Sequence, residues 1–255
     1  MSTVQLLRSG AQQFVRHPVS MLAVTAIPHL VGLGLVVLFC SSLPGRSGAD
    51  LNPVEIWHAM PVTNKFLVFA LLPLNTWLPF AAGLAGVSWI ITEISRGEVP
   101  ESSGLTKNIM RSLFSLGIPF FFLTFPWFIA FQVFVVPSVL VSWFIGFAPI
   151  AIATERAGWW RALKISSQVA GQAAGTTFTL WVLASVTALA MVFARIVAIP
   201  NASLGVNVHT AGGLAFMVLL LAVFESIFDG ALTVLYSHAR TAQSLAKPVA
   251  VSGTS

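Results

Sequence analysis

Six long apolar stretches dominate this sequence, and they constrain its fold more than any other feature. A helix needs about 20 mostly apolar residues to cross the hydrocarbon core of a bilayer. The stretches of about that length are Val19–Cys40, Phe66–Ile94, Leu113–Gln132, Phe134–Ala153, Thr176–Ile199 and Leu214–Tyr236. They predict an all-α fold, with residues 1–255 forming one polytopic membrane bundle of six transmembrane helices.

The composition agrees with a surface that mostly faces lipid. Hydrophobic residues make up 56% of the 255 positions and charged residues only 8%, whereas soluble domains carry about 25% charged residues. The first stretch is longer than the roughly 7–15 apolar residues of a signal peptide, so we expect it to remain as a span. The second contains Pro73 and Pro79, which predict a tilt or a kink.

The basic residues predict the orientation of the bundle. With the N-terminus in the cytoplasm, six spans leave only Arg46, Lys65 and Arg195 of the 13 basic residues outside. The other ten lie inside: Arg8, Arg16, Arg96, Lys107, Arg111, Arg156, Arg161, Lys164, Arg240 and Lys247. This is the positive-inside asymmetry, and it predicts a multi-pass protein with both termini cytoplasmic.

The division between the third and fourth spans depends on the same argument. The two stretches are nearly continuous and are separated only around Gln132 and Pro137. If they formed one helix, the basic cluster from Arg156 to Lys164 would move outside and the asymmetry would be lost. Six spans are therefore the better interpretation.

A short amphipathic segment precedes each outgoing span, which predicts three interfacial helices. In the first, apolar residues recur at helical spacing: Val4, Leu7, Ala11 and Phe14. In the second, Ser102 or Ser103 is the predicted cap of a helix that carries Leu105 and Ile109. In the third, Arg161, Lys164 and Gln168 share one face, and Trp159, Leu163 and Ala170 lie opposite.

Small residues spaced four apart predict places where helices approach closely. The pairs are Gly171 with Gly175, Ala184 with Ala188, and Ala82 with Gly86. Such pairs let two helix backbones come together inside a membrane bundle. We expect them to hold this bundle together internally.

One segment carries a resemblance to a known family. Residues 151–172 read AIATERAGWWRALKISSQVAGQ, and the last span ends with Val234, Leu235 and Tyr236 followed by Arg240. The segment resembles a pattern of bacterial six-span proteins, the glycerophosphoryl diester phosphodiesterase membrane domain and related uncharacterised families. The matching positions are Pro149, Glu155, Gly158, Ala162, Leu163, Ser166 and Gly171, and Tyr236 with Arg240 resembles the closing motif.

The resemblance implies a fold, a topology and the bacterial cytoplasmic (inner) membrane, without an activity. In some relatives the membrane region lies beside a soluble phosphodiesterase barrel, which needs about 250 residues. The longest polar segment in this sequence is roughly 20 residues, too short for a barrel. Within the resemblance, Glu155 is a recurrent feature of its loop.

Three ionisable residues are predicted to lie at membrane depth. Glu225 and Asp229 are four residues apart on the last span and share a face. His29 on the first span is predicted to lie level with Glu225, which allows a His–carboxylate contact between the two spans. His29, Glu225 and Asp229 are the candidate intramembrane polar site. A structural role for them, in hydrogen bonds between helices, is the favoured interpretation, and a path for an ion, a proton or a ligand is the alternative.

A second candidate site is the cytoplasmic interfacial motif formed by Glu155, Trp159, Arg161, Leu163 and Lys164. Glu93 and Glu155 end their spans at the cytoplasmic face. We expect each to pair with Arg96, Arg156 or an interfacial helix. In that position Glu155 would orient the helix that follows it.

Signatures of catalysis and cofactor binding are absent from the sequence. It has no H-E-x-x-H, no G-x-S-x-G and no P-loop, its five His are scattered, and Cys40 is its only cysteine. We therefore predict no catalytic residues, no metal and no cofactor, and the spread of basic residues argues against nucleic acid.

Two functions remain open from these patterns. The favoured one is a non-catalytic integral membrane subunit or scaffold that binds membrane lipids and other integral membrane proteins. The alternative is a small transporter or lipid-handling protein that uses His29, Glu225 and Asp229.

Overall fold

The computed structural model describes residues 1–41, 62–115, 143–184, 186 and 208–246. Within these ranges the chain is helical and contains no strand, which confirms the predicted all-α class. The main helices are α1 (Thr3–Arg16), α2 (Pro18–Ser41), α4 (Val62–Ser95), α7 (Ala148–Glu155), α8 (Trp159–Gln172) and α10 (Val208–Ala246). Shorter helices cover residues 102–115 and 174–184.

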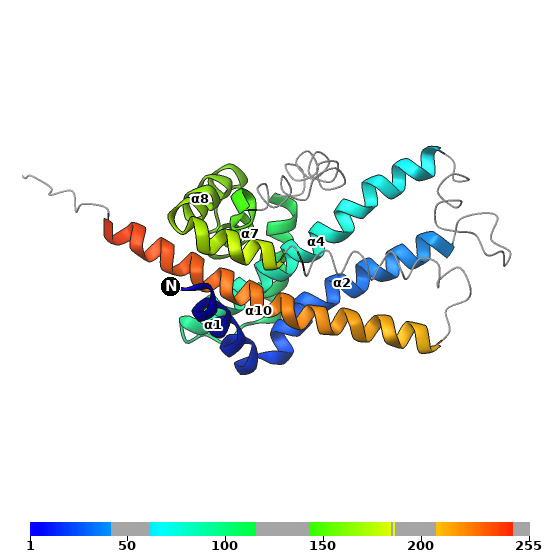
Figure 1. Ribbon diagram of the computed structural model, residues 1–255, viewed down its shortest axis with the longest axis horizontal. Coiled ribbons are helices and arrows are strands. Elements are labelled where there is room, and N and C mark those ends of the chain that lie inside the picture. The colour runs from blue at the N-terminus through cyan, green and yellow to red at the C-terminus, as the bar shows by residue number, and fades with distance from the viewer. Residues whose placement is uncertain (42–61, 116–142, 185, 187–207, 247–255) are drawn as a thin grey trace, which may run out of the picture.

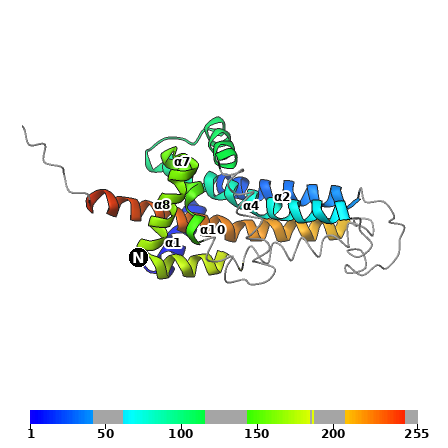
Figure 2. The ribbon, with the colours of Figure 1, turned by 90° about the horizontal axis from the view of Figure 1, so that it is seen from above.

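Three long helices form the body of the protein. Figure 1 shows α2, α4 and α10 extending to one side, while α1, α7 and α8 gather at the other end. Figure 2 shows the same three helices side by side from a second direction. Helix α10 contacts α1, α2, α4 and α8, and α7 contacts both α4 and α8. Helix α10 therefore packs against four of the five other main helices.

The predicted first and second spans correspond to α2 and α4. Helix α2 has 24 residues and contains Pro28, and α4 has 34 residues and continues through Pro73 and Pro79. Helix α10 extends beyond the predicted sixth span at both ends. By length and composition, Ala215–Leu245 is the one segment of the described chain that qualifies as a membrane span; α1 with Pro18–Gly32 is a second if that bent pair counts as one.

The predicted third, fourth and fifth spans are described only in part. Residues 116–142 and 187–199 lie outside the described ranges. In the predicted fourth span, a turn at residues 146–147 separates a short helical piece from α7. Pro149 stands in the first turn of α7, and the Phe147 N–H donates to Ser166 Oγ of α8 at 2.9 Å. The backbone N–H of this turn is thus bonded to a side chain in place of a helical carbonyl.

Helix α1 is present as predicted, but its buried residues lie outside the predicted apolar stripe. Leu6 and Gly10 are its buried residues, whereas Val4 of the predicted apolar stripe is 75% exposed. Helix α1 begins at a capping box between Ser2 and Gln5, and the chain bends by 101° where α1 meets α2. Leu7 and Phe14 of the stripe pack against buried clusters, and a glycine makes the closest approach to another helix.

That approach joins α1 to α10. A Cβ atom on Gly10 would overlap the backbone carbonyl of Ile227, and a Cβ on Gly230 would lie 3.0 Å from the Gly10 Cα. Only glycine allows two helix backbones to pass at this distance. Of the predicted small pairs, Gly86 packs against Val24, whereas Gly171 has open space among the described atoms. Among the described atoms, Gly171 therefore makes no close contact.

The other two predicted interfacial helices are present. The helix at residues 102–115 contains both Ser102 and Ser103, so neither is its cap; the Leu105 N–H donates to the Glu101 carbonyl at 3.0 Å. In α8, Arg161, Lys164 and Gln168 are exposed as predicted. The buried face of α8 is Ala162, Ile165, Ser166, Val169 and Ala170.

Gly10→Ala tests the crossing of α1 and α10. We expect the variant to lose about 1–3 kcal/mol of stability, because the new methyl group meets backbone atoms that cannot rotate away. The measurement is the thermal unfolding midpoint of the purified protein in detergent. Gly171→Ala is the matched control and should be neutral or stabilising by up to about 1 kcal/mol, since its Cβ meets open space. Equal behaviour of the two variants would contradict the close crossing.

Candidate functional site

Helices α2 and α10 bring His29 and Glu225 together, as the sequence predicted. His29 Nε2 lies 2.5 Å from Glu225 Oε2, and the two residues are only 4% and 7% exposed. Residues 196 positions apart in sequence therefore share a buried hydrogen bond. In an apolar interior such a bond is strong, and leaving either partner alone is costly.

A second polar contact lies beside this pair on the same two helices. Thr25 Oγ1 lies 2.9 Å from Ser226 Oγ, and it also contacts the Ala222 carbonyl at 3.3 Å. Thr25 is four residues before His29 and shares a side of α2 with it, and Ser226 directly follows Glu225 on α10. These contacts satisfy the hydroxyl groups and hold α2 against α10 in one register.

Asp229 completes the cluster from α10 and is the most buried of the three predicted residues. Its exposure is 0%, and no described residue provides a hydrogen bond to either carboxylate oxygen. The second oxygen of Glu225, Oε1, also has no described partner. We name His29, Glu225, Asp229, Thr25, Ser226 and Gly83 the three-helix junction.

Gly83 of α4 shows where the two carboxylates point. A Cβ atom built on Gly83 would lie 3.3 Å from Asp229 Oδ2, 3.3 Å from Glu225 Oε1 and 3.2 Å from Thr25 Cγ2. Both oxygens therefore converge on the small space that the missing side chain leaves. An ionised carboxylate without a partner is costly in such surroundings. Among the described residues, no group of three His, Cys, Asp or Glu side chains is arranged to hold a metal ion.

Glu155 lies in a separate contact at the end that holds α1, α7 and α8. Its carboxylate accepts two hydrogen bonds from Arg240, at 2.6 and 2.8 Å, and one from the Tyr236 hydroxyl at 2.5 Å. We name these three residues the α7–α10 clamp. The prediction that Glu155 pairs with Arg96, Arg156 or an interfacial helix was wrong, since its partners come from α10. Glu93 does pair with Arg96, at 3.1 Å.

The clamp changes the acidity of Glu155. Partial burial by itself raises the pKa of this carboxyl, but the hydrogen bonds from Arg240 and Tyr236 favour its charged form. The pKa of Glu155 therefore lies below its ordinary value of 4.5. A fork-shaped guanidinium that donates both bonds also fixes the angle between α7 and α10.

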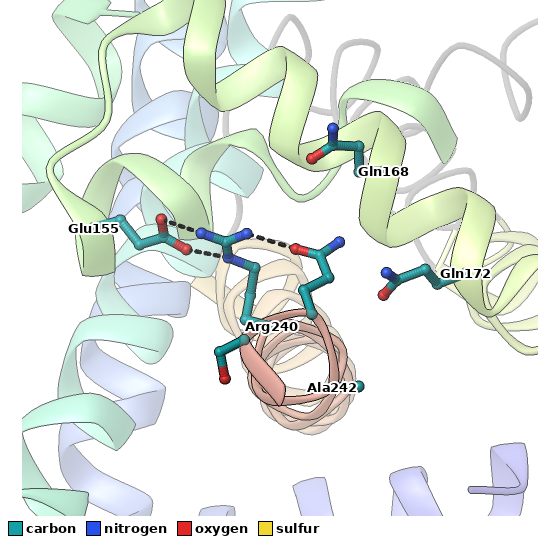
Figure 3. A pocket seen from close by; sticks show the side chains of 7 residues that line it. Glu155, Gln168, Gln172, Arg240 and Ala242 are labelled. Atoms are coloured by element: carbon teal, nitrogen blue, oxygen red, sulfur yellow. Dashed lines mark hydrogen bonds and ion pairs between the residues drawn. The ribbon is translucent and has the colours of Figure 1, made fainter. Parts of the chain in front are cut away.

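The remaining residues of the interfacial motif surround this clamp without joining it. Trp159 is partly exposed, Arg161 and Lys164 are exposed, and Leu163 packs against the core that α7, α8 and α10 share. Next to the clamp lies an open cavity of about 1000 Å³, lined by Gln168, Gln172, Arg240 and Gln243 among others. Figure 3 shows the two amides of α8 facing Arg240 of α10.

A second cavity of about 750 Å³ gathers basic residues from three segments. Its lining includes four cations, which are Arg96, Lys107, Arg111 and Arg156, together with Glu93, Glu98 and Glu101. Excess positive charge at a helical end suits an anionic group. The sequence had placed all four of these cations on one side of the membrane.

Several residues of both sites were missed from the sequence. Thr25 could have been found by its spacing of four residues from His29, because polar residues on one side of an apolar helix need partners. Ser226 had no such spacing signal, since it is adjacent to Glu225. Gly83 had no such signal, since it stands in a run of small residues. The partners of Glu155 appeared only as part of a resemblance.

Comparison of the chain with protein-family models, curated proteins and solved structures finds no match.

The clamp predicts an acid-sensitive contribution to stability. Because the pKa of Glu155 is lowered by folding, the clamp contributes fully above pH 4.5 and is lost as the pH falls through the lower folded value. We expect Glu155→Gln to cost about 1–2 kcal/mol near neutral pH and to flatten this acid limb.

The measurement is the unfolding midpoint as a function of pH for wild type and Glu155→Gln. Gln12→Ala is the control, because Gln12 is exposed on α1 and surface substitutions of this kind have little effect on stability. Arg240→Gln should match Glu155→Gln, and the double variant should be no worse than either single one. Additive losses would show that the two side chains act separately.

Proposed function

We propose that this chain is a non-catalytic integral membrane subunit of six spans, with both termini in the cytoplasm, that binds lipids and other membrane proteins. One observation carries the proposal. Large apolar side chains are exposed every four residues along several helices: Ile27 and Val31 on α2; Phe178, Val182 and Val186; and Phe216, Leu220 and Phe224 on α10. Exposed apolar surface of this extent marks a membrane or a protein partner.

The lengths of the helices support the same proposal. At 1.5 Å per residue, the 24 residues of α2 extend about 36 Å, beyond the roughly 30 Å of a hydrocarbon core. Helix α4 is longer still, with 34 residues. The sharp bend between α1 and α2 suits an amphipathic helix that lies along the membrane surface before a span begins.

The distribution of positive charge supports the proposed orientation. Four cations line one cavity, and Arg8, Arg16, Arg161 and Lys164 are exposed on α1 and α8, which Figure 1 places at the same end of the molecule. A cytoplasmic membrane surface is anionic and attracts such a cluster. The 750 Å³ cavity is the part of this end best suited to a lipid phosphate group.

The orientation is tested by cysteine labelling in intact cells. In a Cys40→Ser background, we expect Ser203→Cys to react with a membrane-impermeant maleimide from outside. Ser2→Cys and Ser252→Cys should react only after the membrane is permeabilised, because both termini are then reached from the cytoplasmic side. Labelling of either terminus in intact cells would refute the six-span orientation.

The subunit function is tested by purification of the tagged chain in mild detergent, followed by mass spectrometry of what accompanies it. We expect a membrane protein in stoichiometric amount. Phe216→Ala combined with Leu220→Ala should weaken this complex, since the pair removes part of the exposed α10 stripe. Val4→Ala, an exposed apolar site on α1, is the control. A chain that purifies alone with a defined lipid or solute would exclude the subunit function.

A second function is favoured by the three-helix junction. A small transporter or lipid-handling protein needs ionisable groups at membrane depth, and His29, Glu225 and Asp229 meet between three helices. His29→Ala, Glu225→Gln and Asp229→Asn are the variants that would separate this function from the subunit function. They should abolish transport while leaving a subunit complex intact.

A further inference from the structure

Three carboxylate oxygens of the three-helix junction have no hydrogen-bond partner among the described residues. Glu225 uses one oxygen on His29, and its other oxygen faces the space at Gly83. Asp229 directs Oδ2 to the same space, although it is fully buried and receives no hydrogen bond from the described residues. Two carboxyl groups that face one point cannot both stay ionised there, because each adds to the cost of the other.

Among the described residues of the neighbouring helices, one other titratable side chain lies next to the two carboxyl groups, and it is His29 of α2. Helix α4 contributes Gly83 there, and Gly10 of α1 lies at a more distant position along α10. Among the described groups, Glu225 is the charged neighbour that acts on Asp229. A proton held at the two carboxyl groups removes one of their two negative charges, which lowers the cost of burying them together in an apolar interior.

We propose that the three-helix junction is a proton-binding site, in which Glu225 and Asp229 share one exchangeable proton at Gly83 and His29 passes that proton to and from water. The proton leaves the carboxyl O–H, the electron pair stays on the oxygen, and the imidazole of His29 accepts the proton through Glu225. The site requires no metal and no second substrate. The proton-binding site is compatible with both proposed functions, the membrane subunit and the transporter.

The test is infrared spectroscopy of the full chain in lipid nanodiscs, which detects the carbonyl stretch of protonated carboxyl groups. At neutral pH, wild type should show one such band, and the band should shift when the solvent is changed to D₂O. Asp229→Asn and Glu225→Gln should each remove or displace it. Gln12→Ala, at an exposed position on α1, should leave it unchanged.

Two further variants separate exchange from a static hydrogen bond. His29→Gln should keep the band but slow its exchange in D₂O roughly a hundredfold, because a positioned proton carrier is lost. His238→Gln, at an exposed position on α10, is the matched control. Gly83→Ala places a methyl group between the two oxygens and should displace the band without disturbing the fold elsewhere.

Four results would overturn the proposal. The first is the absence of a protonated band at neutral pH, and the second is a band that neither Asp229→Asn nor Glu225→Gln changes from wild type. The third is a band that does not exchange within a day, and the fourth is a band that sodium or potassium removes at constant pH. The third would make the proton a static part of the fold. The fourth would make the occupant a metal cation. Normal helix content and a normal elution volume for each variant exclude misfolding as the cause.

Discussion

Helix α10 is the constraint on which the other helices depend, because each reaches it through a different kind of contact. Helix α1 meets it by backbone approach at Gly10 and Gly230, and α2 by the bonds of Thr25 and His29. Helix α7 meets it through the Glu155 carboxylate and Arg240. Apolar packing alone has no direction. These contacts supply the direction, since each is satisfied in one register only.

The polar contacts also explain why so apolar a chain adopts one arrangement of its helices. A helix with a wide apolar face can slide or rotate against its neighbours at little cost, whereas a buried donor that loses its acceptor is penalised at once. His29 and Glu225 therefore specify the register between α2 and α10, as buried polar residues do in some coiled coils.

Much of this arrangement could be predicted from the sequence because it depends on local pattern. The lengths of apolar runs indicated α2, α4 and α10, and depth along the helices indicated the contact of His29 with Glu225. The partner of Glu155 could not be predicted, because Arg240 is 85 residues away and nearer arginines competed for the same carboxylate. The close approach of α1 to α10 was missed because a glycine carries no hydrophobic signal. The turn before α7 depends on Ser166, a side chain from the following helix.

Residues of both candidate sites lie on one side of α10, and its exposed apolar residues lie on the other side. At about 100° per residue, Glu225, Asp229, Tyr236 and Arg240 lie within about 60° of one another, along about 22 Å of helix. This polar stripe faces α2, α4 and α7.

The opposite side of α10 carries the residues that approach Gly10 of α1, which are Ile227, Gly230 and Ala231. Further toward the start of α10, that opposite side carries the exposed Phe216, Leu220 and Phe224. The amphipathic α1 thus covers the apolar face of α10 only at one end. In the proposed orientation, α1 lies where that face leaves the hydrocarbon core, and lipid or a partner protein covers the rest.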